Sequence, residues 1–190
     1  MSFFVHDTAI VSEKANIGLN TKVWHFSHIM DHCTIGDNCI FGQNTFVAPK
    51  VIIGDNCKIQ NNVSIYEGVV LENDVFVGPS VVFTNVINPR SFIERKTEYK
   101  PTLIKRGASL GANVTVICGI TLGAYSFIGA GTTVSKNTKD FGLYYGSPMK
   151  QQGWVSKCGH KLNFDSTNES ICPETGERYI LNNKNVFLNE

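Results

Sequence analysis

Three histidines stand close together near the start of the sequence, at His25, His28 and His32. An imidazole can ligate a metal ion, act as a general base or contact a bound substrate. Ligation by all three would require the side chains of one short segment to converge on a point. We therefore treat His25 and His28 as candidate bases or substrate contacts. A histidine that only serves the surface or an interface is the alternative for each.

Amide side chains form a second group that could do chemistry. They are Gln43, Asn44, Asn61 and Asn62, and Tyr66 follows them. A primary amide both donates and accepts hydrogen bonds, so such a group can bind the polar edges of a base and a sugar. Amides can equally bond to one another in stacked columns. Both interpretations remain open from the sequence.

A hydrophobic residue at every sixth position supplies the frame for these side chains. The series runs from Val11 to Phe83, stops, and resumes from Ile104 to Val134. A period of six fits neither an α-helix nor an isolated alternating strand. Glycine often follows the hydrophobic residue, and a small or β-branched residue stands four positions after it. The pattern predicts an all-β parallel β-helix in which three hexapeptides close one triangular coil.

Eighteen residues in each coil determine which side chains should stack. Gln43 is expected between His25 and Asn61, and Asn44 beneath Asn62. Another column should hold Asp31, Pro49, Glu67 and Asn85. The polar candidates are therefore expected along the edges of the coils, outside the aliphatic core.

The repeat divides the chain into parts. Residues 1–10 are expected to cap the first coil, and residues 11–150 to form the β-helix. A charged excursion at 86–103 breaks its register. It contains Phe92, Ile93 and Tyr99, whose side chains could pack together, so we expect it to be ordered. Residues 141–150 are expected as an exit loop, and residues 151–190 as a β-rich tail with strands near 161–164 and 177–181.

Composition excludes several classes of function. Lys and Arg number 17 against 16 Asp and Glu, which argues against a general nucleic-acid or membrane surface. The chain has neither a signal-peptide start nor an apolar run long enough to span a membrane, so we expect a cytoplasmic protein. Cys158, His160 and Cys172 make an incomplete zinc set, and we expect no metal site.

Several segments together resemble one group of bacterial enzymes. The segments are Val23-Trp24-His25-Phe26, Gly42-Gln43-Asn44, 58–66, Phe83-Thr84-Asn85, Asn88-Pro89-Arg90-Ser91, Ile93-Glu94-Arg95-Lys96, 107–113 and Gly146-Ser147-Pro148. The combination resembles the hexapeptide-repeat N-acetyltransferases of nucleotide-linked 3-amino sugars. Among these it is most similar to those acting on UDP-2-acetamido-3-amino-2,3-dideoxy-glucuronate in surface-polysaccharide (O-antigen and lipopolysaccharide) biosynthesis. The resemblance implies a left-handed β-helix, acetyl-CoA as cosubstrate, a nucleotide-sugar acceptor, and a homotrimer with active sites between subunits.

The resemblance also suggests roles for individual residues. By position, Asn85 is similar to the asparagine that holds the sugar amine, and the family is thought to work without a protein base. The absence of histidine between His32 and His160 agrees with that. A backbone N–H at Gly111 or Ala112 is a candidate for stabilising the oxyanion. The remaining cofactor candidates are Ala130 and four cations that could meet coenzyme A phosphates or simply be solvated: Lys105, Arg106, Lys136 and Lys150.

The charges of the excursion bear on the identity of the acceptor. Arg90, Arg95 and Lys96 on the excursion could bind the carboxylate of a uronate, which favours the UDP-linked glucuronate. The same cations could instead bind diphosphate, and the alternative acceptor is a dTDP-3-amino-3,6-dideoxy-hexose. Two other classes remain: a zinc-dependent hydratase of carbonic-anhydrase type on the same fold, and a non-catalytic trimeric scaffold.

Overall fold

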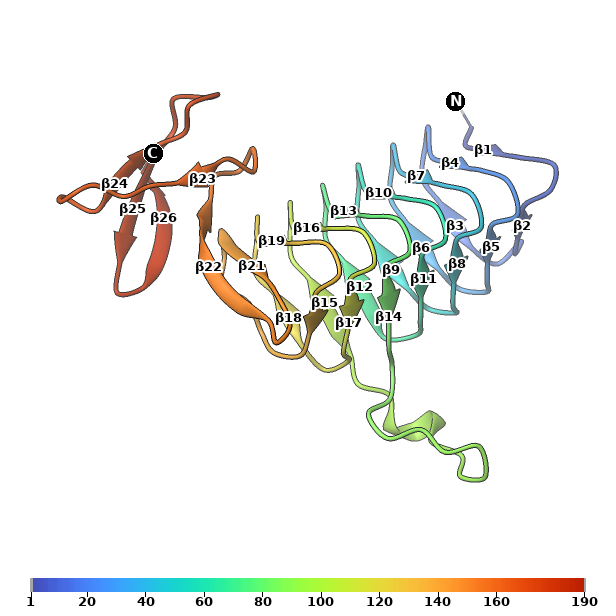
Figure 1. Cartoon of the computed structure of the whole chain (residues 1–190). Helices are drawn as coiled ribbons and strands as arrows, with labels where there is room; N and C mark the ends of the chain where they lie inside the picture. Colours follow the sequence, from blue (N-terminus) through green and yellow to red (C-terminus); the bar gives the residue numbers. More distant parts are fainter. Residues whose placement is uncertain (1, 190) are drawn as a thin grey trace.

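The computed structural model describes residues 2–189, in which short β-strands are joined by turns and by one 3₁₀ turn, η1 at Lys96–Glu98. Three parallel sheets wrap around a common axis and form a left-handed β-helix, which confirms the fold class predicted from the repeat (Figure 1). A small sheet follows the solenoid at its C-terminal end. The described part of the chain contains no helix long and apolar enough to cross a membrane.

Sheets A, B and C are the three faces of the solenoid, and sheet A continues into the tail. Sheet A contains β1 (Phe4–Val5), β4 (Lys22–Val23), β7 (Ile40–Phe41), β10 (Lys58–Ile59), β13 (Phe76–Val77), β16 (Ser109–Leu110), β19 (Phe127–Ile128), β21 (Gly142–Tyr145), β22 (Lys150–Val155) and β23 (Lys161–Leu162). Sheet B contains β2 (Ile10–Val11), β5 (His28–Ile29), β8 (Phe46–Val47), β11 (Ser64–Ile65), β14 (Val82–Phe83), β17 (Thr115–Val116) and β20 (Thr133–Val134). Sheet C contains β3 (Asn16–Ile17), β6 (Thr34–Ile35), β9 (Ile52–Ile53), β12 (Val69–Leu71), β15 (Thr102–Ile104) and β18 (Thr121–Leu122).

The turns between faces are named here by the sheets that they join. In the second coil the A–B corner is residues 24–27 and the B–C corner is residues 30–33, and residues 18–21 before it form a C–A corner. Asparagine often occupies the position of each corner that has a positive φ, as at Asn20, Asn38 and Asn56. Asparagine is among the few residues that tolerate this left-handed conformation. Each corner therefore has one position whose residue type is restricted by the backbone.

Parallel pairing at the predicted spacing builds the core. Lys22 pairs with Ile40, and Ile40 with Lys58, so equivalent residues stack from coil to coil. The inward residues of sheet A form a fully buried column of Val23, Phe41, Ile59, Val77, Leu110 and Ile128. The small inward positions include Cys33, Cys39 and Cys57, which are buried as predicted. The hexapeptide pattern thus correctly identified the inward face of each strand.

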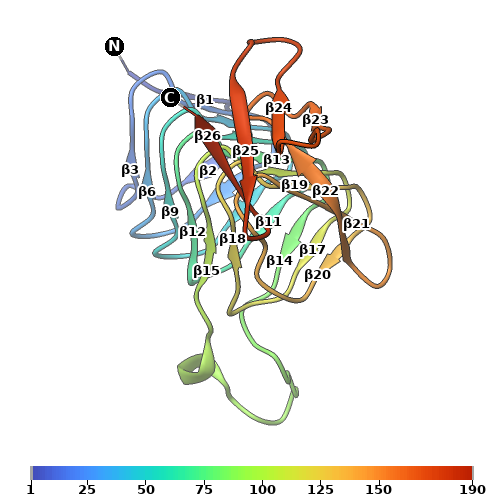
Figure 2. The same cartoon turned by 90° about the vertical axis from the view of Figure 1, so that its left-hand side faces the viewer.

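The excursion leaves the B–C corner between β14 and β15 and projects from the solenoid (Figure 2). Val70 pairs with Leu103 across the insertion, so the coils resume their stacking on its far side. Residues 102 and 103, expected in the excursion, belong to β15. Phe92 does not pack as expected, because its side chain is 82% exposed. Tyr99 is half-buried. The excursion is therefore a loop on a regular scaffold.

The two ends of the solenoid differ from the sequence-based expectation. Within the segment expected as a cap, Phe4–Val5 pairs in parallel with β4 and so belongs to the first coil. Val11 and Ile17 remain partly exposed there. At the other end, the expected exit loop contains β21, which pairs in parallel with β19 and extends sheet A by one further strand. Stacking thus continues beyond the last clear repeat.

The tail folds back on the C-terminal coil around a second hydrophobic core. It contains Phe141, Leu162, Cys172, Tyr179 and Val186. The antiparallel tail sheet consists of β24 (Glu169–Ile171), β25 (Arg178–Asn182) and β26 (Asn185–Asn189). The two predicted tail strands appear as β23 and β25. Strands β22, β24 and β26 were not predicted.

Candidate active site

Asn85 lies at the neck of the excursion, immediately after β14. The N–H of Thr84 still donates to the ladder, to the carbonyl of Val116 at 2.9 Å. The carbonyl of Asn85 then accepts from the N–H of Lys100 at 2.9 Å, which closes the neck. The Asn85 side chain is half-buried, and its amide makes no hydrogen bond within residues 2–189. The main chain of Asn85 is fixed while its amide remains available to a ligand.

A pocket of about 230 Å³ opens beside this amide, between the neck and the excursion. Its lining residues are Asn85, Val86, Pro89, Arg90, Ile93, Glu94, Arg95, Lys96 and Tyr99. Four residues proposed from the sequence therefore lie around one cavity: Asn85, Arg90, Arg95 and Lys96. The excursion supplies nearly all of the wall, which explains why the repeat is interrupted there.

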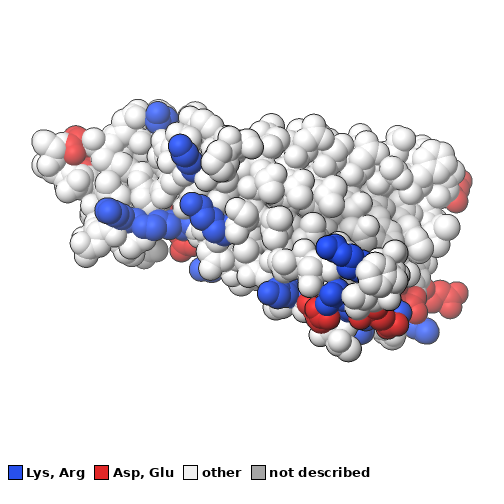
Figure 3. All heavy atoms as spheres, turned by 60° about the horizontal axis from the view of Figure 1, so that its bottom comes forward, with Lys and Arg blue, Asp and Glu red and all other residues white. Residues whose placement is uncertain are grey.

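The cations of this pocket are mostly paired with neighbouring acids. Arg95 Nη1 lies 2.8 Å from Glu98 Oε1, and Lys96 Nζ lies 3.5 Å from Glu94 Oε1. Positive and negative side chains are correspondingly mixed on the excursion (Figure 3). Arg90 contacts only the carbonyl of Pro89, at 2.8 Å, and has no carboxylate partner among the described residues. A ligand anion would therefore meet one guanidinium without a carboxylate partner and two cations that already have carboxylate neighbours, of which Arg95 keeps a buried Nε without a partner among the described residues.

Three of the four A–B corner amides take part in bonds between coils, and the side-chain amide of Gln43 makes none within residues 2–189. Asn44 Nδ2 donates to Asn62 Oδ1 at 3.0 Å, and the N–H of Gln43 donates to Asn61 Oδ1 at 2.9 Å. The coil-to-coil stacking predicted for these pairs is thereby confirmed. The C–A corner uses the same device, since the N–H of Leu19 donates to Asp37 Oδ1 at 2.7 Å. The bonds observed for these amides therefore serve the scaffold.

Aromatic neighbours surround the two candidate histidines. His25 stacks on His6 with ring centroids 3.5 Å apart, at the A–B corner. His28 lies on the outer face of sheet B, where its ring meets Phe46 edge-on at 6.0 Å. The rings of Tyr66 and Phe46 are also neighbours, with centroids 5.6 Å apart. Among residues 2–189, no three His, Cys, Asp or Glu side chains are arranged to hold a metal ion.

The main-chain N–H groups proposed to stabilise the oxyanion differ in whether they already have an acceptor. The N–H of Gly111 already donates to the carbonyl of Ile128 at 2.8 Å, so it is not free to stabilise an oxyanion. The N–H groups of Ala112 and Ala130 have no acceptor within residues 2–189. At several corners an Asn or Asp of the next coil accepts from the equivalent position, as Asn61 does from the N–H of Gln43 at 2.9 Å and Asp140 does from the N–H of Ala124 at 2.8 Å. Alanine cannot do so, and the N–H groups of Ala112 and Ala130 are left open, as are those of His25 and Asn61 at the same corner within residues 2–189.

The four candidate cations for coenzyme A do not gather in one chain. Lys105 and Arg106 lie at the C–A corner, where Lys105 Nζ is 3.6 Å from Asp140 Oδ1. Arg106 Nε donates to Asp74 Oδ2 at 2.9 Å, and this bond raises the pKa of the guanidinium. Lys136 and Lys150 are exposed, the first after β20 and the second at the start of β22. The structure places these cations on different edges of the molecule.

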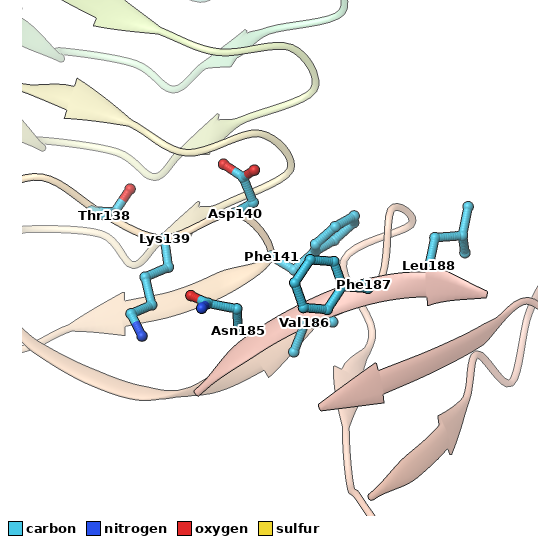
Figure 4. A pocket seen from close by; sticks show the side chains of 8 residues that line it. All are labelled: Thr138, Lys139, Asp140, Phe141, Asn185, Val186, Phe187 and Leu188. Carbon is cyan, nitrogen blue, oxygen red and sulfur yellow. The ribbon is translucent and has the colours of Figure 1, made fainter. Parts of the chain in front are cut away.

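A hollow of about 540 Å³ lies away from these residues. It is formed where the last corner of the solenoid meets β26, with Lys139 and Asp140 on one side and Asn185 to Leu188 on the other (Figure 4). None of the candidate residues lines it. Its walls belong to the junction between the solenoid and the tail.

Comparison with known proteins identifies the family. The model of the bacterial transferase hexapeptide (six repeats) matches residues 14–49, and that of the hexapeptide repeat of succinyl-transferase matches residues 33–67 and 101–136. The chain is 41% identical over 182 residues to dTDP-3-amino-3,6-dideoxy-alpha-D-galactopyranose 3-N-acetyltransferase of Aneurinibacillus thermoaerophilus, and the match covers 93% of this chain and 90% of that protein. The chain belongs to the hexapeptide-repeat nucleotide-sugar N-acetyltransferases. It is therefore an acyltransferase, as the sequence analysis predicted.

Solved structures support the same fold. A hexapeptide transferase family protein from Anaplasma phagocytophilum superposes with a TM-score of 0.55 at 19% identity, covering 81% of this chain and 84% of that one. A galactoside acetyltransferase in complex with coenzyme A superposes with a TM-score of 0.50 at 23% identity, covering 66% and 72%. At such identities the likeness shows that hexapeptide-repeat transferases share this fold.

Proposed function

We propose that this N-acetyltransferase transfers the acetyl group of acetyl-CoA to the 3-amino group of a nucleotide-linked amino sugar. The observation that carries the proposal is the free amide of Asn85 beside the excursion pocket. The A. thermoaerophilus relative is named for this transfer, and the match spans nearly the whole chain. Coenzyme A bound to the galactoside acetyltransferase supports the choice of donor.

The reaction needs alignment more than acid–base help. The lone pair of a neutral sugar amine attacks the thioester carbonyl carbon, an N–C bond forms, and the C–S bond then breaks. The coenzyme A thiolate accepts the proton that leaves nitrogen. Asn85 Oδ1 would accept a hydrogen bond from the amine and so direct its lone pair toward the carbonyl. Positioning of this kind can account for several kcal/mol of the barrier.

The open N–H groups of Ala112 and Ala130 would serve the donor substrate. A backbone N–H aimed at the thioester oxygen stabilises the charge that develops there during attack. These donors lie on the C-terminal coils, where the corner has lost its usual side-chain acceptor. Gly111 contributes differently: a Cβ at Gly111 would lie 2.6 Å from the nitrogen of Ala130, so only glycine lets these coils approach.

The proposed site requires a second copy of the chain. Val82 pairs with Thr115, which places Cys118 in the same column as Asn85 at the B–C corner. Ala112 lies six residues before Cys118, one full side of a coil away, which is about 20 Å at about 3.3 Å per residue. One chain cannot bring an amine held at Asn85 to a thioester held at Ala112. We therefore propose a homotrimer in which the A–B corner of one subunit faces the B–C corner of its neighbour.

The charges around the excursion pocket help to decide between the two candidate acceptor sugars. The case for a uronate rested on Arg90, Arg95 and Lys96, and the last two are paired with Glu98 and Glu94. The A. thermoaerophilus relative is named for a dideoxy sugar without a carboxylate. We therefore favour a dTDP-linked 3-amino-3,6-dideoxyhexose over the UDP-linked glucuronate that the sequence alone favoured.

Two measurements test this proposal. Catalytic efficiency is compared for the neutral dTDP-sugar and the UDP-uronate, with release of free thiol as the readout. We expect the neutral sugar to be acetylated more efficiently, and the reverse order would restore the uronate. Light scattering of the pure protein should give the mass of three chains, whereas an active monomer would exclude the shared site.

A further inference from the structure

An exposed group of aromatic side chains lies at the opposite end of the solenoid from the tail. It consists of Phe4, His6, Trp24, His25 and Phe26 and is called here the N-terminal aromatic cluster. Phe4 and Trp24 have ring centroids 5.3 Å apart, and Trp24 is nearly parallel to His25 at 6.1 Å. Trp24 is 38% exposed and Phe26 60% exposed. Phe4 belongs to β1, and the other four residues follow β1 or β4, the two strands at the N-terminal edge of sheet A (Figure 1).

Phe26 occupies a position that the backbone makes unfavourable for it. Its φ is +57°, in the left-handed region where Asn is the most frequent non-glycine residue of this chain. Two other aromatic residues share this conformation, Tyr125 with φ +55° and Phe141 with φ +58°. Those two rings stack on each other at 5.3 Å and pack in the second hydrophobic core. Phe26 lies outside that core: its N–H donates to Thr8 Oγ1 at 3.1 Å, and its ring, 6.2 Å from that of His25, is 60% exposed. A non-glycine residue with this φ can mark a functional position.

The cluster lies on the corner that also holds the open N–H groups of Ala112 and Ala130. Passing from the C-terminal coils toward the N-terminus, the same corner position holds Ala130, Ala112, Pro79, Asn61, Gln43 and His25. Pro79 shares its coil with β14, after which Asn85 follows. His25 is three coils farther on, about 14 Å at the ~4.8 Å spacing of paired strands. That distance is comparable to the reach of an extended nucleoside diphosphate.

We infer that the N-terminal aromatic cluster stacks the nucleobase of the acceptor, so that the nucleotide lies along the A–B corner with its amino sugar at Asn85 of the neighbouring subunit. This inference rests on the proposed function for the direction of the ligand. Stacking on exposed aromatic rings is tolerant of base identity, because every base has a π face. The cluster would thus anchor the nucleotide, and the excursion pocket would select the sugar.

The test measures nucleotide binding to the full-length protein apart from catalysis. dTDP, UDP and coenzyme A are titrated separately by calorimetry onto wild type, Phe26→Asn and Trp24→Leu. Asparagine suits the left-handed corner, so Phe26→Asn should fold at least as well as wild type. Phe187→Asn removes a phenylalanine that is also exposed, on β26, and serves as the control.

We expect Phe26→Asn and Trp24→Leu to weaken dTDP or UDP binding about 10- to 100-fold, with coenzyme A affinity and oligomer mass unchanged. Phe187→Asn should bind like wild type. Unchanged nucleotide affinity in both cluster variants, loss of coenzyme A affinity instead, a change of oligomer mass alone, or no binding of either nucleotide to wild type would each overturn the inference. If nucleotide binding depends on the cluster but no amino sugar is acetylated, the proposed transfer fails and the nucleobase site stands.

Discussion

The carbonyl of Asn85 accepts a hydrogen bond from the N–H of Lys100 at 2.9 Å, across the base of the excursion. This bond joins the two ends of an irregular segment and fixes the main chain of Asn85 to the rigid solenoid. Most other corner asparagines use their amides to bond between coils, as Asn44 does with Asn62. Asn85 is held by its main chain alone, so its side chain is free for a substrate.

Replacing Asn85 by alanine should therefore remove catalysis and leave the fold intact. We expect kcat for acetyl transfer to fall about 10²- to 10³-fold, the loss typical of one positioning group. Asn56→Ala is the matched control, because Asn56 donates to Asp74 in a corner ladder and has a positive φ. That variant should lose stability and keep kcat. Equal turnover in Asn85→Ala and wild type would remove Asn85 from the mechanism.

Ala112→Pro tests the open main-chain donor without a change in coil geometry. Pro79 occupies the equivalent position of the preceding coil, between Gly78 and Ser80, so proline is compatible with this corner. The substitution deletes one N–H, and we expect kcat to fall about 10²-fold while thermal stability is retained. Ala112→Ser keeps the N–H and should behave like wild type. Full activity of the proline variant would show that this N–H does not contact the thioester.

The dependence of rate on pH tests the absence of a protein base. With Asn85 only orienting the amine, the rate should rise on one limb set by deprotonation of the sugar amine. No limb near the ordinary histidine pKa of about 6.5 is expected. His25→Ala and His28→Ala should raise KM more than they lower kcat, since both histidines lie among aromatic neighbours. Loss of turnover in either variant, accompanied by loss of a limb near pH 6.5, would restore a histidine base.

The Cys172 thiol in the tail should make the stability of the fold depend on pH, independently of catalysis. Burial opposes ionisation of the Cys172 thiol, but hydrogen bonds with Ser156, Thr175 and the main chain outweigh it and lower its pKa to about 7. An ordinary thiol has a pKa of about 8.5, so the unfolded chain binds more protons between these values. Stability should therefore rise from about pH 7 to pH 8.5, and the gain should be lost as pH falls through 7. Denaturant titrations of wild type and Cys172→Ala measure it, and an identical pH slope in both would contradict the lowered pKa.

The period of six made much of the scaffold predictable. It correctly identified inward residues such as Phe41 and Leu110, because stacking of identical coils leaves only one face of each strand buried. It also placed Gln43 beneath Asn61, since eighteen residues return the chain to the same corner. Beyond the last hexapeptide, the sequence predicted fewer of the strands that the structure contains. Strands β24 and β26 are held by antiparallel pairing within the tail. The tail has no sequence repeat from which this pairing could be predicted.

The site was only partly predictable, for physical reasons. Asn85, Arg90 and Lys96 are close in sequence and line one pocket. The open N–H groups of Ala112 and Ala130 are visible only after every main-chain donor is assigned, because alanine itself carries no signal. Phe26 had a signal that the sequence analysis did not use: an aromatic residue at a corner position that often holds Asn.

The central claim, transfer of acetyl from acetyl-CoA to a nucleotide-linked 3-amino sugar, has one direct test. The pure protein is incubated with acetyl-CoA and either a dTDP-3-amino-3,6-dideoxyhexose or the matched sugar with a 3-hydroxyl group. Free thiol and product mass are followed together. We predict one thiol released per amide formed with the amino sugar, and none above background with the hydroxyl sugar. No thiol release with this or any other nucleotide-linked 3-amino hexose would contradict the account.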